Sequence, residues 1–254
     1  MLTRPEISAQ ILETLCAFTD NTCLKIFGRL ILETPSDNWQ SHTSSAHFTL
    51  QWPEPRPCLS SAVLNGGLVS ARSLINLRVE RDANAPLHTP EQSLQQAQQR
   101  LQLPDTCVGM MTAASMASLR HSHSHIYGEA LAVYVSCGLS NARRAGDPCD
   151  WKPTQAMPVG TINSVVIADL SFSTAGMVEL HSLISEAKAA VLQDMNIRSP
   201  VSGQIATGTG TDACAIISGC GAPVRWLGKH TDIGEHIARQ YMDALRSSID
   251  AFYC

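Results

Sequence analysis

The chain has 254 residues, 44% hydrophobic and 16% charged, with a formal net charge of −4. This composition is typical of a folded globular protein and excludes a disordered chain. The lysines and arginines form no basic stripe, no apolar run reaches the roughly 18 residues of a membrane-spanning helix, and the N-terminus lacks a signal-peptide core. We therefore expect no nucleic-acid or membrane partner and a cytoplasmic protein.

The length and even composition predict a single domain over residues 1–254, because no linker-like shift in composition interrupts the chain. The nine cysteines are an odd number and none forms a Cys-x-x-Cys pair. This pattern indicates neither a disulfide framework nor a zinc knuckle, so most of the cysteines are expected to be small buried side chains.

The first third of the chain predicts one helix followed by strands. Residues 5–17 have the pattern of a short amphipathic helix, and residues 23–32 and 46–52 are rich in β-branched and aromatic residues, as in a strand pair. The prolines at 53, 55 and 57 cannot donate ladder hydrogen bonds, so they are expected to end this unit. A further strand then leads into a sharp turn at Asn65, and residues 68–79 return as a strand with Asn76 and Arg78 on one face.

The middle of the chain predicts a helix and two buried strands. Thr89, Pro90 and Gln92 form a capping-box signature that opens a helix to about residue 101. Residues 107–114 and 129–137 read as strands. Between them His121, His123 and His125 alternate with serines, which would form a metal-binding comb on a strand but favours an exposed polar loop.

The last third predicts strand and helix pairs. Residues 160–170 form a strand, and Ser173 or Thr174 caps a helix with one apolar stripe. Residues 204–207 and 212–218 are short strands joined through a Gly-Thr-Gly-Thr loop, and Thr231 or Asp232 caps the final helix. The order of elements predicts an α+β fold with mixed α/β layers, in which a mixed, largely antiparallel sheet is covered by helices.

Four polar groups suggest a ligand site, and two of them lie in loops. The loop at residues 208–211, followed by Asp212, has the composition of an anion-binding nest or an oxyanion hole, although the loop taken by itself favours a Gly-rich hairpin. It is not a P-loop, since no Lys follows the glycines. Asn141, Arg143, Arg144 and Asp147 form either a polar clamp or a capping loop with solvated arginines.

The other two polar groups lie on or beside helices. His230 lies at a helix N-terminus, where the helix dipole favours the neutral imidazole that could act as a base or a ligand. Glu186 and Lys188 lie about 200° apart on their helical wheel. They cannot both point straight at one ligand.

Taken together and in order, these segments resemble the adenosylcobinamide amidohydrolase family, the CbiZ-type enzymes. The matching segments are SSAVLNGG (60–67), MTAA (111–114), GLSNARRAGD (138–147), GTIN (160–163), EAKAA (186–190), TGTGTDA (207–213) and GKHTDIG (228–234). The resemblance covers roughly residues 58–240. It implies hydrolysis of the amide that joins adenosylcobyric acid to its aminopropanol arm, so that cobinamide re-enters cobalamin synthesis.

Amide hydrolysis needs a base, a proton donor and stabilisation of the oxyanion. The chemistry of the matching residues assigns Asp212 or Glu186 as the general base, and His230 or Lys188 as the proton donor. Asn163 is expected to stabilise the oxyanion together with the backbone amides of the Gly-Thr loop.

A covalent variant uses Thr209 or Thr211 as the nucleophile, but a Thr nucleophile usually has an N-terminal amine as its base. The residues expected to bind the corrinoid substrate are Asn65, Asn76, Asn141, Arg144, Asp147, Thr161, Thr209 and Thr211.

Three alternatives remain open from the sequence. No cofactor is required, but a divalent metal could be held by His230, Asp212 and Glu186, whose N and O atoms suit zinc or manganese. The chain could also be a corrinoid-binding module without hydrolytic activity, although the Asp-x-His-x-x-Gly motif is absent around His230. A phosphate-binding transferase is a third reading, and no Lys-bearing loop supports it.

Overall fold

The computed structural model describes residues 38–79, 89–149 and 160–253. The helix predicted at residues 5–17 and the strand at 23–32 lie outside these described residues. The single-domain organisation of the whole chain therefore stays a prediction. None of the described helices is both long and apolar enough to cross a membrane.

The fold is built on an eight-stranded sheet in the order β4-β3-β2-β10-β8-β6-β5, with β1 paired to β2. Its strands are β1 (Gln40–Thr43), β2 (His47–Ser60), β3 (Gly67–Arg78), β4 (Cys107–Thr112), β5 (Arg120–Ile126), β6 (Glu129–Cys137), β8 (Ile162–Ala168) and β10 (Ala213–Ile217). Among the strand pairs of the described residues, only β3–β4 and β10–β8 are parallel. The prediction of a mixed, largely antiparallel sheet is confirmed.

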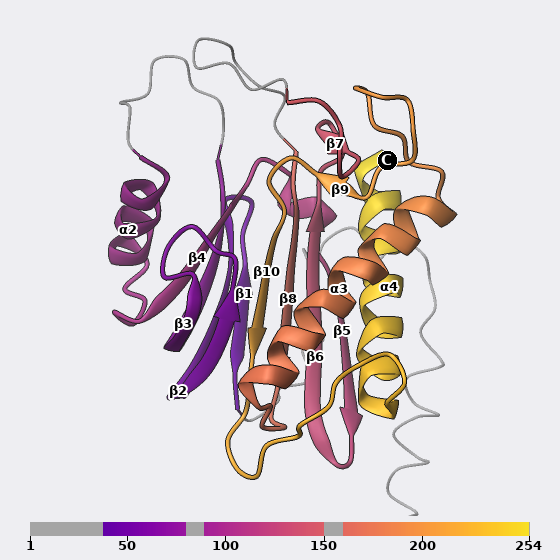
Figure 1. The fold of residues 1–254 in the computed structure, drawn as a ribbon. Helices are drawn as coiled ribbons and strands as arrows, with labels where there is room; N and C mark the ends of the chain where they lie inside the picture. The colour runs from indigo at the N-terminus through magenta and orange to yellow at the C-terminus, as the bar shows by residue number, and fades with distance from the viewer. Residues whose placement is uncertain (1–37, 80–88, 150–159, 254) are drawn as a thin grey trace, which may run out of the picture. The chain divides into compact units, whose positions relative to one another are not determined.

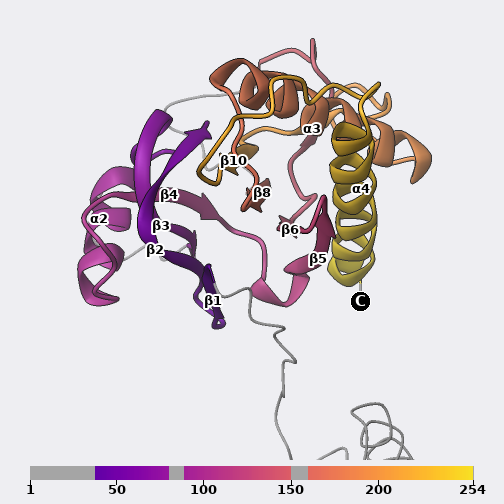
Figure 2. The ribbon, with the colours of Figure 1, turned by 90° about the horizontal axis from the view of Figure 1, so that it is seen from below.

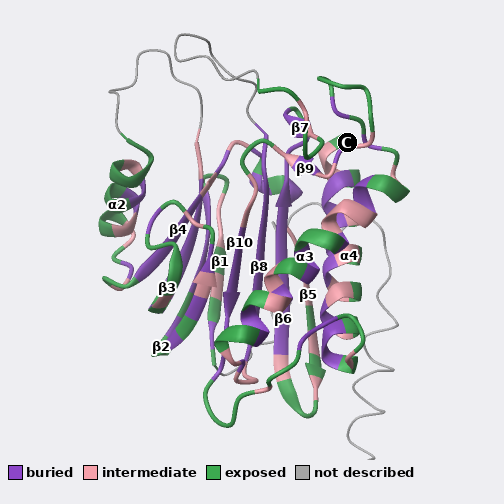
Figure 3. Ribbon diagram, in the orientation of Figure 1, coloured by how far each residue is buried: buried purple, intermediate pink, exposed green. Residues whose placement is uncertain are grey.

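Helices cover the sheet. They are α2 (Pro90–Arg100), α3 (Thr174–Asp194), α4 (Asp232–Tyr253) and the short 3-10 turn η2 (Met116–Ser118). Figures 1 and 2 show α3 and α4 packed side by side against β10, β8, β6 and β5, while α2 packs at the β3–β4 end. The central strands are buried along most of their length, and the outward faces of the helices are exposed (Figure 3).

The helices form where their sequences predict them. The Thr89 side chain accepts a hydrogen bond from Gln92 N while the Gln92 side chain accepts one from Thr89 N, so the capping box is complete. Ser173 caps α3 by accepting from Gly176 N at 3.0 Å, and Thr231 caps α4 by accepting from Gly234 N at 3.0 Å. The buried stripe of α3 is Met177, Leu180, Ile184, Ala187 and Val191, as predicted.

Two predicted elements are wrong. Strand β2 does not end at the prolines but continues to Ser60, because the pairing with β3 shifts register between Gln51 and Arg56. Pro53 and Pro55 lie in this irregular stretch, where no partner needs their missing N–H. Residues 204–207 form no strand; Ile205 makes only an isolated bridge to Arg198.

The alternating histidines lie on strand β5, so the favoured interpretation as a loop is also wrong. Ser122 and Ser124 contact Gln240 and His236 of α4, and the histidines occupy the opposite, more exposed face. The hydroxyl of Tyr134 lies 3.2 Å from His123 Nε2. Within residues 38–79, 89–149 and 160–253 no three His, Cys, Asp or Glu side chains cluster as a metal site would require.

Buried His47 makes stability depend on pH. Burial lowers its pKa from the ordinary 6.5, and the nearby His42 and Arg100 lower it further. Below about pH 6.5 the unfolded chain therefore binds this proton more readily than the folded chain. We expect the Tm to fall as the pH drops below about 6.5, and to stop falling on this account below the lower pKa of the folded state.

A thermal unfolding series from pH 8 to pH 5 checks this prediction, with H47Q as the matched variant that has no imidazole to titrate. The H47Q profile should be flatter than that of the parent. A Tm that stays constant or rises towards pH 5 in the parent contradicts the expectation.

Candidate active site

Asp212 and Lys188 form the centre of the candidate site. Asp212 directly precedes β10, and Lys188 lies in the last third of α3, which connects β8 to its parallel neighbour β10. This connection brings the end of the helix over the start of the strand. Lys188 Nζ lies 2.6 Å from Asp212 Oδ2, and the two side chains are 16% and 13% exposed. An ion pair this near the surface can still reach a ligand.

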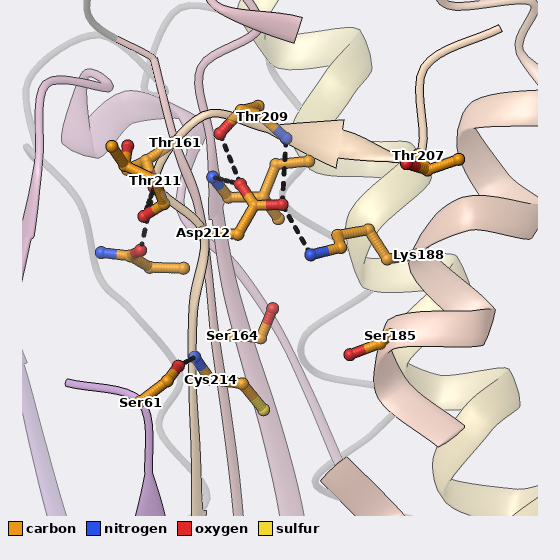
Figure 4. A network of polar contacts seen from close by, with 12 residues as sticks. Ser61, Thr161, Ser164, Ser185, Lys188, Thr207, Thr209, Thr211, Asp212 and Cys214 are labelled. Carbon is orange, nitrogen blue, oxygen red and sulfur yellow. Dashed lines mark hydrogen bonds and ion pairs between the residues drawn. The ribbon is translucent and has the colours of Figure 1, made fainter. Parts of the chain in front are cut away.

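The Asp212 carboxylate is held by four donors. Besides Lys188, it accepts hydrogen bonds from Ile162 N at 2.9 Å, from Thr209 N at 3.0 Å and from the Thr209 hydroxyl at 2.5 Å. Figure 4 shows Thr209 and Lys188 converging on this carboxylate. Its position is therefore fixed by donors from two strands and a helix.

The Gly-Thr loop is shaped by contacts that exclude side chains at its glycines. A Cβ on Gly208 would lie 2.4 Å from Asp212 Oδ2, and one on Gly210 would lie 2.3 Å from Asn141 Nδ2. Strand β9 (Gly208–Thr209) pairs with β7 (Ala142–Arg143), not with a neighbouring strand of its own loop. The simple hairpin interpretation is therefore wrong, because the loop wraps around the carboxylate.

A G208A variant should lose activity although no reacting group is removed. The added methyl group displaces the Asp212 carboxylate from its hydrogen bonds, and a displacement of about 1 Å in a reacting group can cost roughly 100-fold in rate. Steady-state kinetics, with a thermal unfolding curve to show that the chain is folded, measure the effect. Parental kcat in a folded G208A protein contradicts the role given to this contact.

Three threonines surround the carboxylate and have different partners. The hydroxyl of Thr211 donates to Gly160 O at 3.2 Å, and Thr161 Oγ1 donates to Thr211 O at 2.7 Å. Thr207 Oγ1 accepts from Ala145 N at 2.8 Å. These bonds join the start of β8 and the loop after β7 to the Gly-Thr loop, so they fix the walls of the site.

A polar depression of about 450 Å³ opens over the ion pair. It is lined by Arg143, Arg144, Ala145, Lys188, Thr207, Gly208, Thr209, Gly210, Thr211 and Asp212. Three of these side chains are cationic and one is anionic. The depression therefore favours ligands that present oxygen acceptors.

The loop after β7 holds the arginines at the rim. Arg144 Nη1 donates to Ile205 O at 3.0 Å, and Arg143 Nε donates to Asn141 Oδ1 at 3.2 Å. Asp147 accepts from Ser199 Oγ and from Arg144 N, at 2.5 and 2.9 Å. The hydrogen bond from Ser199 is the largest of the effects that lower the pKa of Asp147. Asp147 thus braces the loop and does not line the depression.

Asn163 has no N–H left for an oxyanion. Its Nδ2 donates to Asn76 Oδ1 at 2.7 Å and to Met111 O at 2.8 Å, and both asparagines are buried. Asn76 Nδ2 in turn donates to Ser136 Oγ at 2.9 Å. The predicted oxyanion role of Asn163 and the predicted substrate contact of Asn76 are therefore corrected: the two amides join β3 and β4 to β8 and β6.

Two of the four loop amides are also engaged. Thr209 N donates to Asp212 Oδ2 and Gly210 N donates to Asn141 O at 3.1 Å, so neither points at a ligand. Asn65 is exposed and its Nδ2 donates to Cys107 O at 2.7 Å, outside the residues that line the depression. Of the predicted substrate contacts, Arg144, Thr209 and Thr211 line the depression, while Asn141 and Thr161 support it from behind.

Glu186 and His230 lie away from the ion pair. Glu186 is more than half exposed and pairs with Lys229 on the surface. His230 is exposed and lies beside Gly228 and Glu179. Glu179 precedes Lys188 by nine residues, about 13 Å along the helix axis at 1.5 Å per residue. Of the predicted catalytic residues, the structure brings Asp212 and Lys188 together. It does not bring together His230, Asp212 and Glu186, which were the possible metal ligands.

The thiols beneath the site do not supply a nucleophile. Burial raises the pKa of Cys214 to about 12, and burial followed by the charge of Asp212 raises that of Cys137 to about 12. The pKa of fully buried Tyr241 is also raised well above 10, first by burial. These groups stay protonated at neutral pH and act as packing.

Arg143 and Thr207 line the depression but were not among the residues expected from the sequence to bind the substrate. The signal was present, since Arg143 lies in the segment read as a polar clamp and Thr207 begins the Gly-Thr segment. Sequence spacing could not say which of Arg143 and Arg144 faces a ligand, because Arg143 ends a two-residue strand and Arg144 directly follows it. In the structure both reach the depression.

A family model described as adenosylcobinamide amidohydrolase, CbiZ, matches residues 33–253. A Methanocaldococcus jannaschii protein, itself named as uncharacterized, is 36% identical over 91 residues, which are 35% of this chain and 36% of that protein. The match thus spans about a third of the curated relative.

Two solved structures are similar at low sequence identity. A Pyrococcus horikoshii protein has a TM-score of 0.39 at 10% identity, with 84% of this chain and 78% of that chain covered. An L-aminopeptidase D-Ala-esterase/amidase from Ochrobactrum anthropi has a TM-score of 0.37 at 11% identity, with 85% and 82% covered.

Proposed function

Because the chain belongs to the adenosylcobinamide amidohydrolase family, we propose that it hydrolyses the amide between adenosylcobyric acid and the aminopropanol arm of adenosylcobinamide, in corrinoid salvage. The observation that carries this proposal is the Asp212–Lys188 pair at the floor of a polar depression. The pair provides an anion and a cation that are hydrogen-bonded to each other and accessible to a ligand, as acid–base chemistry on an amide requires.

The residues divide the chemical tasks as follows. Asp212 accepts the proton of the attacking hydroxyl group, and Lys188 returns a proton to the departing amine. Lys188 and Arg143 are two of the three cations that line the depression, and they stabilise the negative charge on the carbonyl oxygen. This assignment replaces Asn163 and the amides of Thr209 and Gly210, whose N–H groups are used within the protein.

The size of the depression indicates how the substrate is held. A volume of about 450 Å³ is at the lower end of small-molecule sites, which span roughly 300–1,000 Å³. It suits the aminopropanol arm and the scissile amide but not a whole corrin macrocycle. We therefore place the macrocycle outside the depression, with its peripheral amides near Arg144 at the rim.

Incubation of the purified protein with adenosylcobinamide, with and without chelator, tests the proposal by mass spectrometry. Formation of adenosylcobyric acid and free aminopropanol in both samples is the expected result. Product only in the absence of chelator would assign the chemistry to a metal instead of the Asp212–Lys188 pair. Binding of the corrinoid without any product would overturn the hydrolase and favour a corrinoid-binding module.

A further inference from the structure

The three threonines of the Gly-Thr segment are not equivalent. The Thr211 hydroxyl donates to the Gly160 carbonyl, and the Thr207 hydroxyl accepts from Ala145 N. Thr209 Oγ1 lies 3.2 Å from Gly160 O but only 2.5 Å from Asp212 Oδ1. Since a hydroxyl has one proton, the shorter distance directs that proton to the carboxylate. Among these three, only Thr209 is placed to lose its proton to Asp212.

The same contacts provide what an activated nucleophile needs, namely a base beside the hydroxyl and a third group that orients the base. The hydroxyl lies within hydrogen-bond reach of a base, and the base is oriented by a third group, Lys188, at 2.6 Å on its other oxygen. Thr209 also lines the depression into which the amide would enter. A nucleophile, its base and the orienting cation are therefore present on one wall of the site.

The backbone around Thr209 is fixed. Thr209 pairs with Ala142 of β7, and its N–H donates to Asp212 Oδ2. Its β-branched side chain has few χ1 rotamers. The contacts of Gly208 and Gly210 on either side leave no room for side chains that would cover the hydroxyl. The hydroxyl is thus preorganised towards Asp212.

We propose that Thr209 Oγ is the nucleophile of the hydrolysis and forms an ester with the corrinoid acid. This inference rests on the proposed function and adds a covalent intermediate to it. Threonine nucleophiles usually rely on an N-terminal amine as their base. Thr209 lies inside the chain, and the carboxylate of Asp212 takes the place of that amine.

The reaction balances in two steps. In the first, Thr209 Oγ bonds to the amide carbon while its proton passes to Asp212, the C–N bond breaks, and the amine leaves with a proton delivered through Asp212 and Lys188. In the second, water adds to the ester carbon and gives its proton to Asp212. The C–O bond to Thr209 then breaks, Thr209 regains the proton, and the acid is released. The sum is amide plus water giving acid plus amine.

Acid-quenched turnover mixtures test the covalent step, because an acyl-enzyme would carry the corrinoid chromophore and mass on the denatured chain. We expect such an adduct in the parent during turnover and its release by hydroxylamine as the hydroxamate. T209V should form no adduct and lose roughly 1,000-fold or more in kcat, as when a nucleophile is removed. T209S should keep the adduct. T211V changes the wall of the site and slows turnover, but it should still form the adduct, because the Thr211 hydroxyl donates to Gly160 O and not to Asp212.

The outcomes separate this inference from the proposed function. Turnover in T209V above a tenth of the parental kcat overturns the nucleophile while the amidohydrolase stands. Turnover of the parent without adduct or hydroxamate also overturns it, even if T209V is inactive, because Thr209 would then only position Asp212. Absence of any turnover in the parent removes the proposed function and the covalent step together.

Discussion

Replacing Asp212 with Asn is expected to lower kcat by about 1,000-fold or more, within the range of roughly 100- to 10,000-fold that a general base contributes. The Asn side chain keeps the shape of the carboxylate but cannot take up a proton. It also turns an amide NH₂ group towards either Lys188 or the Thr209 hydroxyl, both of which are donors to the present carboxylate. The loss should therefore appear in kcat with the fold retained.

The matched control for this prediction is E186Q. Glu186 and Asp212 were equally eligible as the base from the sequence, but Glu186 pairs with Lys229 at the surface. E186Q should keep the parental kcat and KM, since exposed ion pairs contribute little to stability. Circular dichroism and thermal unfolding of D212N establish that the protein is folded. Full activity in D212N, or a large loss in E186Q, would reverse the assignment.

Replacing Lys188 with Met is the second large expected effect, a loss of roughly 100- to 10,000-fold in kcat. The Met side chain matches the aliphatic part of Lys188 but removes the charge that pairs with Asp212 and the proton for the departing amine. Steady-state turnover of adenosylcobinamide measures the loss. A substrate with a better leaving group than an alkylamine should recover part of the rate, because it needs less protonation.

Two variants control the Lys188 prediction. K229M removes the surface lysine that pairs with Glu186, and it should leave turnover unchanged. K188R keeps a cation beside Asp212 but cannot donate a proton readily, since a guanidinium stays protonated. It should therefore bind substrate and remain slow. Parental kcat in K188R would show that Lys188 supplies only charge and would remove the proton donor from the mechanism.

The losses of kcat in D212N and K188M should not multiply in the double variant. Asp212 and Lys188 are hydrogen-bonded to each other, so either substitution disables the same pair. The double variant D212N/K188M is expected to have about the activity of the weaker single variant. Multiplicative losses would indicate two independent groups.

The sequence by itself determined the features that depend only on residues close together along the chain. The capping box at Thr89 and the caps at Ser173 and Thr231 predicted where three helices begin, because each cap acts within three residues along the chain. The apolar stripe of α3 predicted its buried face. The fold class and the family resemblance also followed from the order of these segments, and the match over residues 33–253 agrees with that resemblance.

Only the tertiary structure decided what depends on contacts between distant segments. Strand β2 continues past its prolines because of a register shift against β3, which no local rule contains. Glu186 and Lys188 lie within one turn of α3, but Lys188 contacts Asp212 while Glu186 pairs with Lys229 on the surface. The crossover from β8 to β10 brings Asp212 beside this helix, which decides for Asp212 and Lys188 over Glu186 and His230. Spacing predicts which residues share a face of one element, but distances between elements are set by packing, and these distances decide which groups can exchange a proton.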